Sequence, residues 1–320
     1  MVVNLDKPKS VRLEASTICQ LKCKCCYMGN KDNAVGFGFL KYDDFVSFVD
    51  KNPYIKQIEL SNSGEIFLNP DLLKIIKYAY EKGVKLSAYN GVNLNNVSDE
   101  VLEALVKYEF ERITCSIDGT SQETYSQYRV GGDFESVISN IKKINKYKKL
   151  HDSTYPALKY QFIIFGHNEH EIPRAKELAK ELNMEINFKF NWNSSYSPIK
   201  DEDFVRRETA LTTKPSNDEL LKDKKSYLRS MCVKMWTQPQ INWDGRLLGC
   251  CVQFKDDYGV NVFDIGLQDA LISEKFAYAK QMLMNKQPSR EDISCSTCQY
   301  YLNMRKNDSF VTEEEILEYL

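Results

Sequence analysis

Residues 11–26 read VRLEASTICQLKCKCC, a short apolar strand that leads directly into a group of cysteines. Within it, Cys19, Cys23 and Cys26 follow the spacing CxxxCxxC. Three thiolates in one loop suit one face of a cubane iron–sulfur cluster and leave its fourth iron open. A zinc site would normally use four protein ligands, and none of the chain's three histidines lies near this loop in the sequence. The stretch therefore indicates a strand followed by a cluster with one free position.

The cysteines of the whole chain fall into two groups. Nine of the ten lie either at positions 19–26 or at positions 232–298, and Cys115 stands alone on an expected strand. The net charge of −2 over 320 residues provides no basic field for a nucleic acid or an anionic membrane. No apolar stretch is long enough for a membrane span, and the N-terminus has no signal-peptide pattern. We therefore expect a cytoplasmic protein whose cysteines bind metal, with no nucleic-acid or membrane partner.

Short apolar strands alternate with amphipathic helices from residue 10 to about residue 191. Expected strands are 11–15, 55–60, 85–89, 112–117, 159–165 and 185–190, and the helices between them are 42–50, 70–82, 98–107, 134–148 and 171–182. Parallel strands need crossovers of this length, and right-handed crossovers curl them into a doubly wound sheet or a partial barrel. In either fold, functional residues belong at the carboxyl ends of the strands.

The remainder of the chain has a different pattern. Residues 194–231 are polar and are predicted to form a linker, with a weak helical pattern at 218–230. A hairpin is expected at 238–248 because Asp244-Gly245 is a strong two-residue turn signal. Helices are expected at 267–285 and from Thr312. The predicted organisation is a barrel domain at 1–193, a linker at 194–231 and a cysteine-bearing domain at 232–320.

The second cysteine group is arranged around the expected hairpin. Cys232 and Cys250 fit the pattern C-x12-G-x4-C, and Cys295 and Cys298 form a CxxC loop. A hairpin returns the chain to its start, so the first pair can lie side by side while the CxxC loop completes the set. Four thiolates would fill every iron of one further cluster, and zinc is the alternative for the same four ligands.

The chain resembles the radical S-adenosylmethionine (SAM) superfamily, which has CxxxCxxC after the first strand of a partial barrel. Further segments agree with the family in chain order, namely Ser63-Gly64-Glu65, Asn90-Gly91, Ser116-Ile117-Asp118-Gly119 and Tyr128-Arg129. The resemblance implies an α/β fold, a partial (β/α)6 TIM barrel. It also implies a [4Fe–4S] cluster whose open iron binds SAM and cleaves it to a 5'-deoxyadenosyl radical that abstracts a substrate hydrogen atom.

The same resemblance implies the residues that contact SAM. They are Ser63, Gly64, Glu65, Asn90, Ser116, Asp118 and Arg129, where arginine suits a carboxylate because its fork binds both oxygens. One position departs from the family pattern, since Cys25 stands where an aromatic residue is usual and Tyr27 comes one place late. Cys25 is thereby a candidate spare ligand.

The second group resembles the SPASM domain, and more closely its shortened twitch form, because no cysteine follows Cys298. The resemblance implies one auxiliary [4Fe–4S] cluster held by Cys232, Cys250, Cys295 and Cys298. The expected cofactors are therefore two [4Fe–4S] clusters and SAM, and the expected electron donor is a flavodoxin- or ferredoxin-type reductant.

Two reactions remain open. In a dehydrogenation the auxiliary cluster accepts an electron and a base accepts a proton; the candidate bases are Glu123, Asp133, Lys189, Asp201 and Asp203. In an epimerisation Cys251 donates a hydrogen atom to the substrate radical. The alternative is that Cys251 is a packing residue or a spare cluster ligand. A third alternative is a non-catalytic iron–sulfur or zinc scaffold protein.

The expected substrate is a sugar, an aminocyclitol or a peptide. A small polar molecule is favoured because only 18 residues precede Cys19, too few for the leader-binding domain of many peptide-modifying relatives. Trp192, Tyr196 and Trp236 are candidates for stacking on a sugar ring, with core packing as the alternative.

Overall fold

Stretches that are far apart in the sequence fold together in this protein. The computed structural model describes residues 7–28, 35–191, 193, 195–211, 227–252 and 256–319. One compact unit consists of Met1–Glu14, Asn33–Glu59 and Pro215–Leu320, and the other consists of Ala15–Asp32 and Leu60–Lys214. The CxxxCxxC loop therefore belongs to the second unit, whereas the four C-terminal ligand candidates belong to the first.

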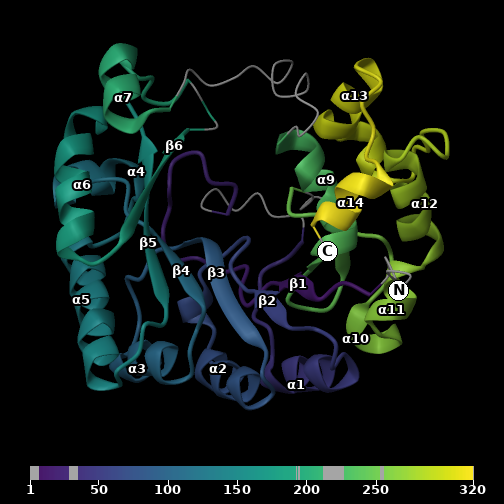
Figure 1. The fold of residues 1–320 in the computed structure, drawn as a ribbon, viewed down its shortest axis with the longest axis horizontal. Helices are drawn as coiled ribbons and strands as arrows, with labels where there is room; N and C mark the ends of the chain where they lie inside the picture. The colour runs from purple at the N-terminus through teal and green to yellow at the C-terminus, as the bar shows by residue number, and fades with distance from the viewer. Residues whose placement is uncertain are drawn as a thin grey trace. The chain divides into compact units, whose positions relative to one another are not determined.

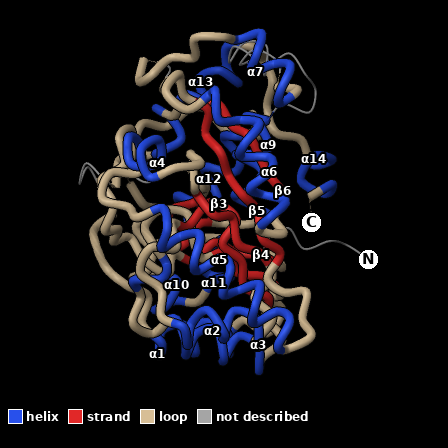
Figure 2. Tube along the Cα trace, turned by 90° about the vertical axis from the view of Figure 1, so that its left-hand side faces the viewer, coloured by secondary structure: helices blue, strands red, loops and turns tan. Residues whose placement is uncertain are grey.

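The second unit is built on four parallel strands. They are β3 (Lys85–Val92), β4 (Arg112–Ser116), β5 (Ala157–Ile164) and β6 (Glu185–Phe190), each paired with its successor. Their helices are α2 (Leu72–Glu81), α3 (Asp99–Lys107), α4 (Gln122–Tyr128), α5 (Phe134–Leu150), α6 (Ile172–Glu181) and α7 (Glu202–Thr209). Figure 1 shows α5 and α6 along the outer side of β5 and β6, and Figure 2 shows the same alternation of helix and strand.

Local sequence explains where these helices begin. Ser98, Ser121 and Asp133 each accept a hydrogen bond from a backbone N–H in the first turn of α3, α4 and α5. Such N-caps satisfy donors that have no partner within the helix. The buried faces then follow the helical period, for example Leu102 and Leu105 on α3.

The first unit combines the start of the chain with its C-terminal part. Strand β1 (Ser10–Leu13) pairs in parallel with β2 (Gln57–Glu59) and with β7 (Gln240–Ile241), and β8 (Leu247–Gly249) pairs antiparallel with β7. The helices of this unit are α1 (Tyr42–Lys51), α9 (Tyr227–Thr237), α10 (Val262–Ile265), α11 (Leu267–Leu271), α12 (Glu274–Leu283), α13 (Gln299–Lys306) and α14 (Glu313–Glu318).

The predicted α/β fold with a parallel strand series is confirmed. All six expected strands form, and each pairs in parallel with a neighbour of the series inside its own unit. The hairpin forms as β7 and β8, with Gly245 at φ 89° in the turn. The helix expected from Thr312 is α14, which begins with a capping box between Thr312 and Glu315. The domain boundaries at 193 and 231 remain predictions.

Three features differ from the expectation. The single helix expected at 267–285 is two helices, because the chain breaks at Ile272 and Ser273 and the Ser273 hydroxyl bonds back to Ala270 O. Helix α7 lies within the expected linker and is capped by Asp201, and its only buried residue is Val205. Most of the weak pattern at 218–230 lies outside the described residues. Helices α4, α10 and α13 were not predicted because they are short, and α9 was predicted only through its first residues, 227–230.

No helix within the described part of the chain is long and apolar enough to cross a lipid bilayer.

Candidate functional site

The cysteine loop of the second unit packs its sulfurs into an apolar cluster. Cys23 is buried with Leu21, Tyr128 and Phe165, and Cys19 and Cys26 pack against this group. Cys25 is exposed and has a left-handed backbone, with φ 52°. The loop thus groups the three cysteines of the CxxxCxxC pattern and leaves Cys25 outside the buried set.

Backbone hydrogen bonds fix this loop to the chain that follows α4. Lys22 N donates to Val130 O at 2.9 Å, and Lys24 N donates to Tyr128 O at 3.2 Å. Cys23 lies between these two bonds, so its position is tied to the end of α4 although more than a hundred residues separate them in the sequence.

Two polar side chains donate to the cysteine sulfurs. Arg129 Nη1 is 3.7 Å from Cys23 Sγ, and Asn93 Nδ2 is 3.8 Å from Cys19 Sγ. The pKa of Cys19 is raised to about 12, chiefly by burial, and Glu65, Cys23 and Cys26 contribute to the rise. Burial also raises the pKa of Cys23, whereas Arg129 lowers it. Bound metal stabilises thiolates, so a buried set of thiols with a cationic donor has the chemistry of a metal–sulfur site.

A buried ion pair holds Arg129 in place. Asp118 is fully buried at the end of β4, and its Oδ2 accepts from Arg129 Nε at 2.6 Å. Its Oδ1 accepts from Ile163 N on β5 at 2.6 Å. Burial raises the pKa of Asp118, while Arg129 and the Ile163 bond lower it. Asp118 therefore anchors the guanidinium to the ends of two strands, and the guanidinium reaches Cys23.

The segment Ser63-Gly64-Glu65 lies against the chain that enters the cysteine loop. Gly64 N donates to Ser16 O at 3.0 Å, and Glu65 N donates to Ile18 O at 2.8 Å. A Cβ on Gly64 would lie 2.6 Å from both of those carbonyl oxygens. Glycine is required here because two backbones meet with no space for a side chain. Ser63 accepts from the Tyr27 hydroxyl at 3.2 Å.

Glu65 is a buried acid beside the loop. Its carboxylate accepts from Asn93 N at 2.6 Å and from Phe67 N at 3.3 Å. Burial raises its pKa to about 7, although both hydrogen bonds lower it. Glu65 thus orients Asn93, whose amide reaches Cys19.

The remaining expected SAM contacts lie on β3 and β4. Asn90 Nδ2 donates to Asn62 Oδ1 at 2.9 Å. Ser116 is opposite Gln161 in the strand register, and Gln161 Nε2 donates to its hydroxyl at 3.4 Å. A Cβ on Gly91, which has φ 129°, would lie 2.5 Å from Ser116 Oγ. Gln161 Oε1 is buried without a hydrogen-bond partner among the described residues, which marks a polar position on this face of the sheet.

The sequence prediction missed Asn93 and Gln161. A glutamine inside the otherwise apolar end of β5, and the Asn93-x-Asn95 pair just after β3, were the available signals. Neither belongs to a recognisable motif, since their importance comes from neighbours that only folding supplies.

The first unit gathers the four C-terminal ligand candidates. Cys232 lies on α9, Cys250 directly follows β8, Cys295 lies within the 3-10 turn Ser294–Thr297, and Cys298 follows that turn just before α13. Burial raises the pKa of Cys232, and Cys250, Cys295, Cys298 and Cys251 raise it further in that order. Burial raises the pKa of Cys295 to about 11. These influences place the four cysteines in one region of the first unit.

No group of three or more His, Cys, Asp or Glu side chains in the described ranges is arranged around a single metal ion. In a cubane cluster each thiolate binds a different iron, so its sulfurs need not converge on one point. Of the proposed ligands, Cys23, Cys232 and Cys250 are buried, and Cys19, Cys26, Cys295 and Cys298 are partly buried.

Two further cysteines lie outside these sets. Cys251 is partly buried, and its thiol donates to Met231 Sδ at 3.6 Å. Cys115 is fully buried on β4, as expected for a core residue.

The candidate bases differ in their surroundings. Asp133 and Asp201 cap α5 and α7 with their carboxylates, and Asp203 pairs with Arg206 at 3.3 Å. Lys189 lies on β6 opposite Ile163, a residue that packs against the cysteine cluster. The side chain of Lys189 is exposed, desolvation nonetheless lowers its pKa, and Asp118 raises that pKa. Glu123 lies in the first turn of α4.

A cavity of about 310 Å³ opens beside the carboxyl ends of β5 and β6. Tyr196 lines it and packs edge-on against Phe165, with ring centroids 5.6 Å apart. The cavity is lined by Ile164, Phe190, Asn191, Tyr196, Ser197, Pro198, Ile199, Glu202, Val205, Arg206 and Leu211. Trp236 is a buried residue of the first unit, and Trp192 lies outside the described residues.

A parallel α/β barrel series with a cysteine loop after its first strand defines an iron–sulfur enzyme of the SAM-cleaving type. The chain belongs to the radical SAM superfamily, whose family model matches residues 13–179, just over half of its length. Membership implies SAM and a [4Fe–4S] cluster, as the resemblance predicted.

Similar proteins agree with this assignment. An AdoMet-dependent heme synthase from Methanosarcina barkeri is 30% identical over 149 residues, which cover 46% of this chain and 42% of that protein. The match thus spans less than half of the curated relative.

Among solved structures, Streptococcus suis SuiB bound to S-adenosylmethionine has a TM-score of 0.65 at 15% identity, covering 92% of this chain and 72% of that chain. SuiB bound to its precursor peptide SuiA has a TM-score of 0.63 at 13% identity, covering 92% of this chain and 70% of that chain. At these identities the likeness establishes the fold, a partial TIM barrel.

Gly64→Ala tests the contact between Ser63-Gly64-Glu65 and the cysteine loop. The added methyl displaces the backbone at Ser16 and Ile18, so we expect a loss of about 1–3 kcal/mol in unfolding free energy. We also expect less iron bound after reconstitution, measured by metal analysis. Gly83→Ala is the control, because its Cβ meets nothing within 4 Å, although its φ of +67° adds about 1–2 kcal/mol of backbone strain. A normal iron content in Gly64→Ala would show that iron binding does not depend on the contact between Gly64 and the cysteine loop.

Glu65→Gln tests the raised pKa of this carboxyl. A folded-state pKa of about 7, against 4.5 for the free group, means that the folded protein holds the proton more tightly. Proton binding by Glu65 therefore adds to the unfolding free energy. The whole of this contribution is present below pH 4.5, and it is lost as the pH rises through about 7. Relative to Glu65→Gln, the wild-type unfolding free energy should fall by about 3 kcal/mol between pH 4.5 and 8.

Urea unfolding of the metal-free protein under reducing conditions measures this difference. Glu100→Gln, at an exposed position on α3, is the control and should follow the wild-type profile. Parallel pH profiles for wild type and Glu65→Gln would show that Glu65 has an ordinary pKa.

Proposed function

We propose that this radical SAM enzyme is an oxidoreductase with two [4Fe–4S] clusters. Cys19, Cys23 and Cys26 hold the cluster that binds SAM, and the auxiliary cluster is held by Cys232, Cys250, Cys295 and Cys298, as in a twitch-type SPASM domain. The observation that carries the proposal is the second group of cysteines in the first unit, of which Cys232 and Cys250 are buried and Cys295 and Cys298 are partly buried. A radical SAM enzyme that only generated the radical would not require this second group.

The proposed SAM-binding residues are those of the family pattern, except that Arg129 is given a different main role. Ser63, Gly64, Glu65, Asn90, Ser116 and Asp118 form the proposed site at the carboxyl ends of the strands. Arg129 is already paired with Asp118 and directed at Cys23, so its main role in the proposal is to stabilise that thiolate. Charge-assisted N–H bonds to a ligand sulfur stabilise its negative charge.

Dehydrogenation is the reaction that two clusters serve best. When bound, the first cluster would supply the electron that cleaves SAM, and the auxiliary cluster would accept the electron that the substrate radical loses on becoming the oxidised product. This chain's residues must then take up a proton. Lys189 is the proposed proton acceptor because it lies opposite Ile163, a residue that packs against the cysteine cluster, and because desolvation lowers its pKa although its side chain is exposed. Asp133 and Asp201 already serve as helix caps.

The proposed substrate is a small polar molecule, such as a sugar or aminocyclitol, or a peptide. The cavity beside Tyr196 offers an aromatic ring together with Asn191, Glu202 and Arg206, a combination that suits a polar group carried on an apolar frame. The fold's likeness to SuiB, which binds a precursor peptide, keeps the peptide class in the proposal. The proposed electron donor is a flavodoxin- or ferredoxin-type protein.

Metal analysis and SAM cleavage test the cluster assignment. Anaerobically reconstituted protein should bind about eight irons per chain and form 5'-deoxyadenosine with SAM and dithionite. Cys23→Ser should abolish 5'-deoxyadenosine formation, because the SAM-binding cluster loses a ligand. Cys298→Ser should lower the iron content toward about four while cleavage persists. Cys115→Ala, a buried core cysteine, is the control and should keep both properties.

Zinc in place of iron, with no 5'-deoxyadenosine, would overturn the enzyme assignment and support a scaffold protein. About four irons per chain with normal SAM cleavage would contradict the auxiliary cluster and leave the SAM-cleaving activity in the proposal.

Epimerisation is the second candidate, because Cys251 directly follows the proposed ligand Cys250 and is only partly buried. A thiol there can give a hydrogen atom to a substrate radical. With a substrate that raises 5'-deoxyadenosine formation above its basal rate, epimerisation should place solvent deuterium at an inverted carbon, and Cys251→Ala should abolish this. Dehydrogenation predicts a two-electron oxidised product that Cys251→Ala leaves unchanged. Mass spectrometry and NMR of the product separate the outcomes.

A further inference from the structure

Tyr258 lies beside one of the proposed auxiliary ligands. Its side chain is buried at 4% exposure, and its hydroxyl oxygen is 3.3 Å from Cys295 Sγ. The ring packs edge-on against Phe276, with centroids 4.9 Å apart. A tyrosine hydroxyl that is buried needs a hydrogen-bond partner, and the sulfur of Cys295 supplies one.

The direction of this bond follows from the state of the cysteine. A cysteine bound to iron is a thiolate and has no proton to donate. In the metallated protein only the tyrosine can therefore be the donor, so the contact is O–H to S. Met235 Sδ lies 4.0 Å from the same hydroxyl and is a weaker acceptor than a thiolate.

The ring of Tyr258 packs closely against the backbone of Gly249. A Cβ on Gly249 would lie 2.6 Å from Tyr258 Cε2, and Gly249 has φ 92°, which favours glycine. Gly249 is next to Cys250, and Tyr258 N donates to Leu247 O at 3.0 Å. The tyrosine is thereby packed against the same hairpin strand that leads into a second proposed ligand.

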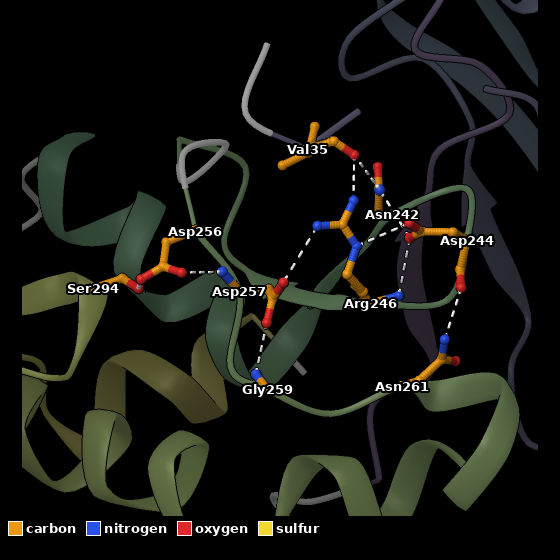
Figure 3. Close-up of polar contacts among 9 residues, drawn as sticks. All are labelled: Val35, Asn242, Asp244, Arg246, Asp256, Asp257, Gly259, Asn261 and Ser294. Atoms are coloured by element: carbon orange, nitrogen blue, oxygen red, sulfur yellow. Dashed lines mark hydrogen bonds and ion pairs between the residues drawn. The ribbon is translucent and has the colours of Figure 1, made fainter. Parts of the chain in front are cut away.

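The residues flanking Tyr258 are held by an arginine clasp, which we define as Arg246 with Asp244 and Asp257 (Figure 3). Arg246 Nε donates to Asp244 Oδ2 at 2.8 Å, and Arg246 Nη1 donates to Asp257 Oδ2 at 3.4 Å. Arg246 Nη2 also donates to Val35 O. The clasp ties the hairpin turn to the residue just before Tyr258.

A second hydrogen bond holds the residue next to Cys295. Asp256 Oδ2 accepts from Ser294 Oγ at 2.8 Å, and Ser294 immediately precedes Cys295 (Figure 3). Asp257 Oδ1 also accepts from Gly259 N at 2.7 Å. The positions before and after Tyr258 are thus fixed, and one of these bonds reaches the neighbour of Cys295.

We propose that Tyr258 donates a hydrogen bond to the metal-bound sulfur of Cys295 and raises the reduction potential of the auxiliary cluster, and that the arginine clasp positions it. The inference rests on the proposed function. Reduction adds negative charge that is shared by the ligand sulfurs, so a donor at a sulfur stabilises the reduced state more than the oxidised state. In a dehydrogenase this makes the auxiliary cluster a better electron acceptor.

Tyr258→Phe tests the hydrogen bond with little change in packing. The midpoint potential of the auxiliary cluster, followed by EPR during a redox titration of the reconstituted enzyme, should be lower than in wild type. At the wild-type midpoint potential, the ratio of reduced to oxidised auxiliary cluster should fall about two- to tenfold. Tyr278→Phe is the matched control, because its hydroxyl contacts Pro288 O on the surface and no sulfur, and it should keep the wild-type potential.

Arg246→Met and Asp257→Asn test the clasp in the same titration. Each should lower the potential in the same direction as Tyr258→Phe by a smaller amount, because Tyr258 is displaced and not removed. If Arg246→Met does not fold, the midpoint potential of Asp257→Asn tests the clasp by itself. Unchanged potentials in these variants, with a shift in Tyr258→Phe, would overturn the positioning role.

Failure of the Tyr258 inference and failure of the proposed function would give different experimental results. A wild-type potential in Tyr258→Phe, in protein that carries about eight irons, would overturn this inference and leave the two-cluster function standing. Wild-type protein that binds no iron at the C-terminal cysteines would overturn the proposed function itself.

Discussion

The buried ion pair between Asp118 and Arg129 is the interaction on which the cysteine site depends. Asp118 is fully buried, and it accepts from Arg129 and from the backbone of Ile163. A buried carboxylate is costly unless it is paired and fully hydrogen-bonded, and here both conditions are met. Arg129 in turn reaches Cys23, whose loop is bonded to the backbone at Tyr128 and Val130. One ion pair thus joins two strands, the end of α4 and the cysteine loop.

Both cysteine groups solve the same physical problem in different ways. Buried thiols resist ionisation, as the raised pKa values of Cys19 and Cys295 indicate, so a site for metal-bound thiolates must offset their negative charge. In the second unit a guanidinium lies at Cys23. In the first unit a neutral hydroxyl, that of Tyr258, lies at Cys295. A cationic donor and a neutral donor differ in strength, so the two proposed clusters would receive different stabilisation at their ligand sulfurs.

Much of the fold was predictable because its determinants are local. Alternating apolar strands and amphipathic helices gave the six strands, and Asp244-Gly245 gave the hairpin. The break between α11 and α12 was not predictable from periodicity, since apolar residues continue across Ser273. Helix α7 was missed because it buries only Val205 and its start depends on the Asp201 cap. Short helices carry too few residues for a periodic pattern to be distinguished from a polar loop.

By itself, the sequence determined the superfamily, the strand order along the chain and the candidate ligands, because spacing and residue type within short motifs are enough for these. Only the tertiary structure decided that β1 pairs with β7 and that Arg129 contacts both Asp118 and Cys23. It also decided that Asn93 and Tyr258 lie beside cysteine sulfurs and that Gln161 lies beside Ser116. Each of these depends on contacts between residues tens to hundreds of positions apart. Such contacts are fixed by packing and by the need to pair buried polar groups, which no local pattern contains.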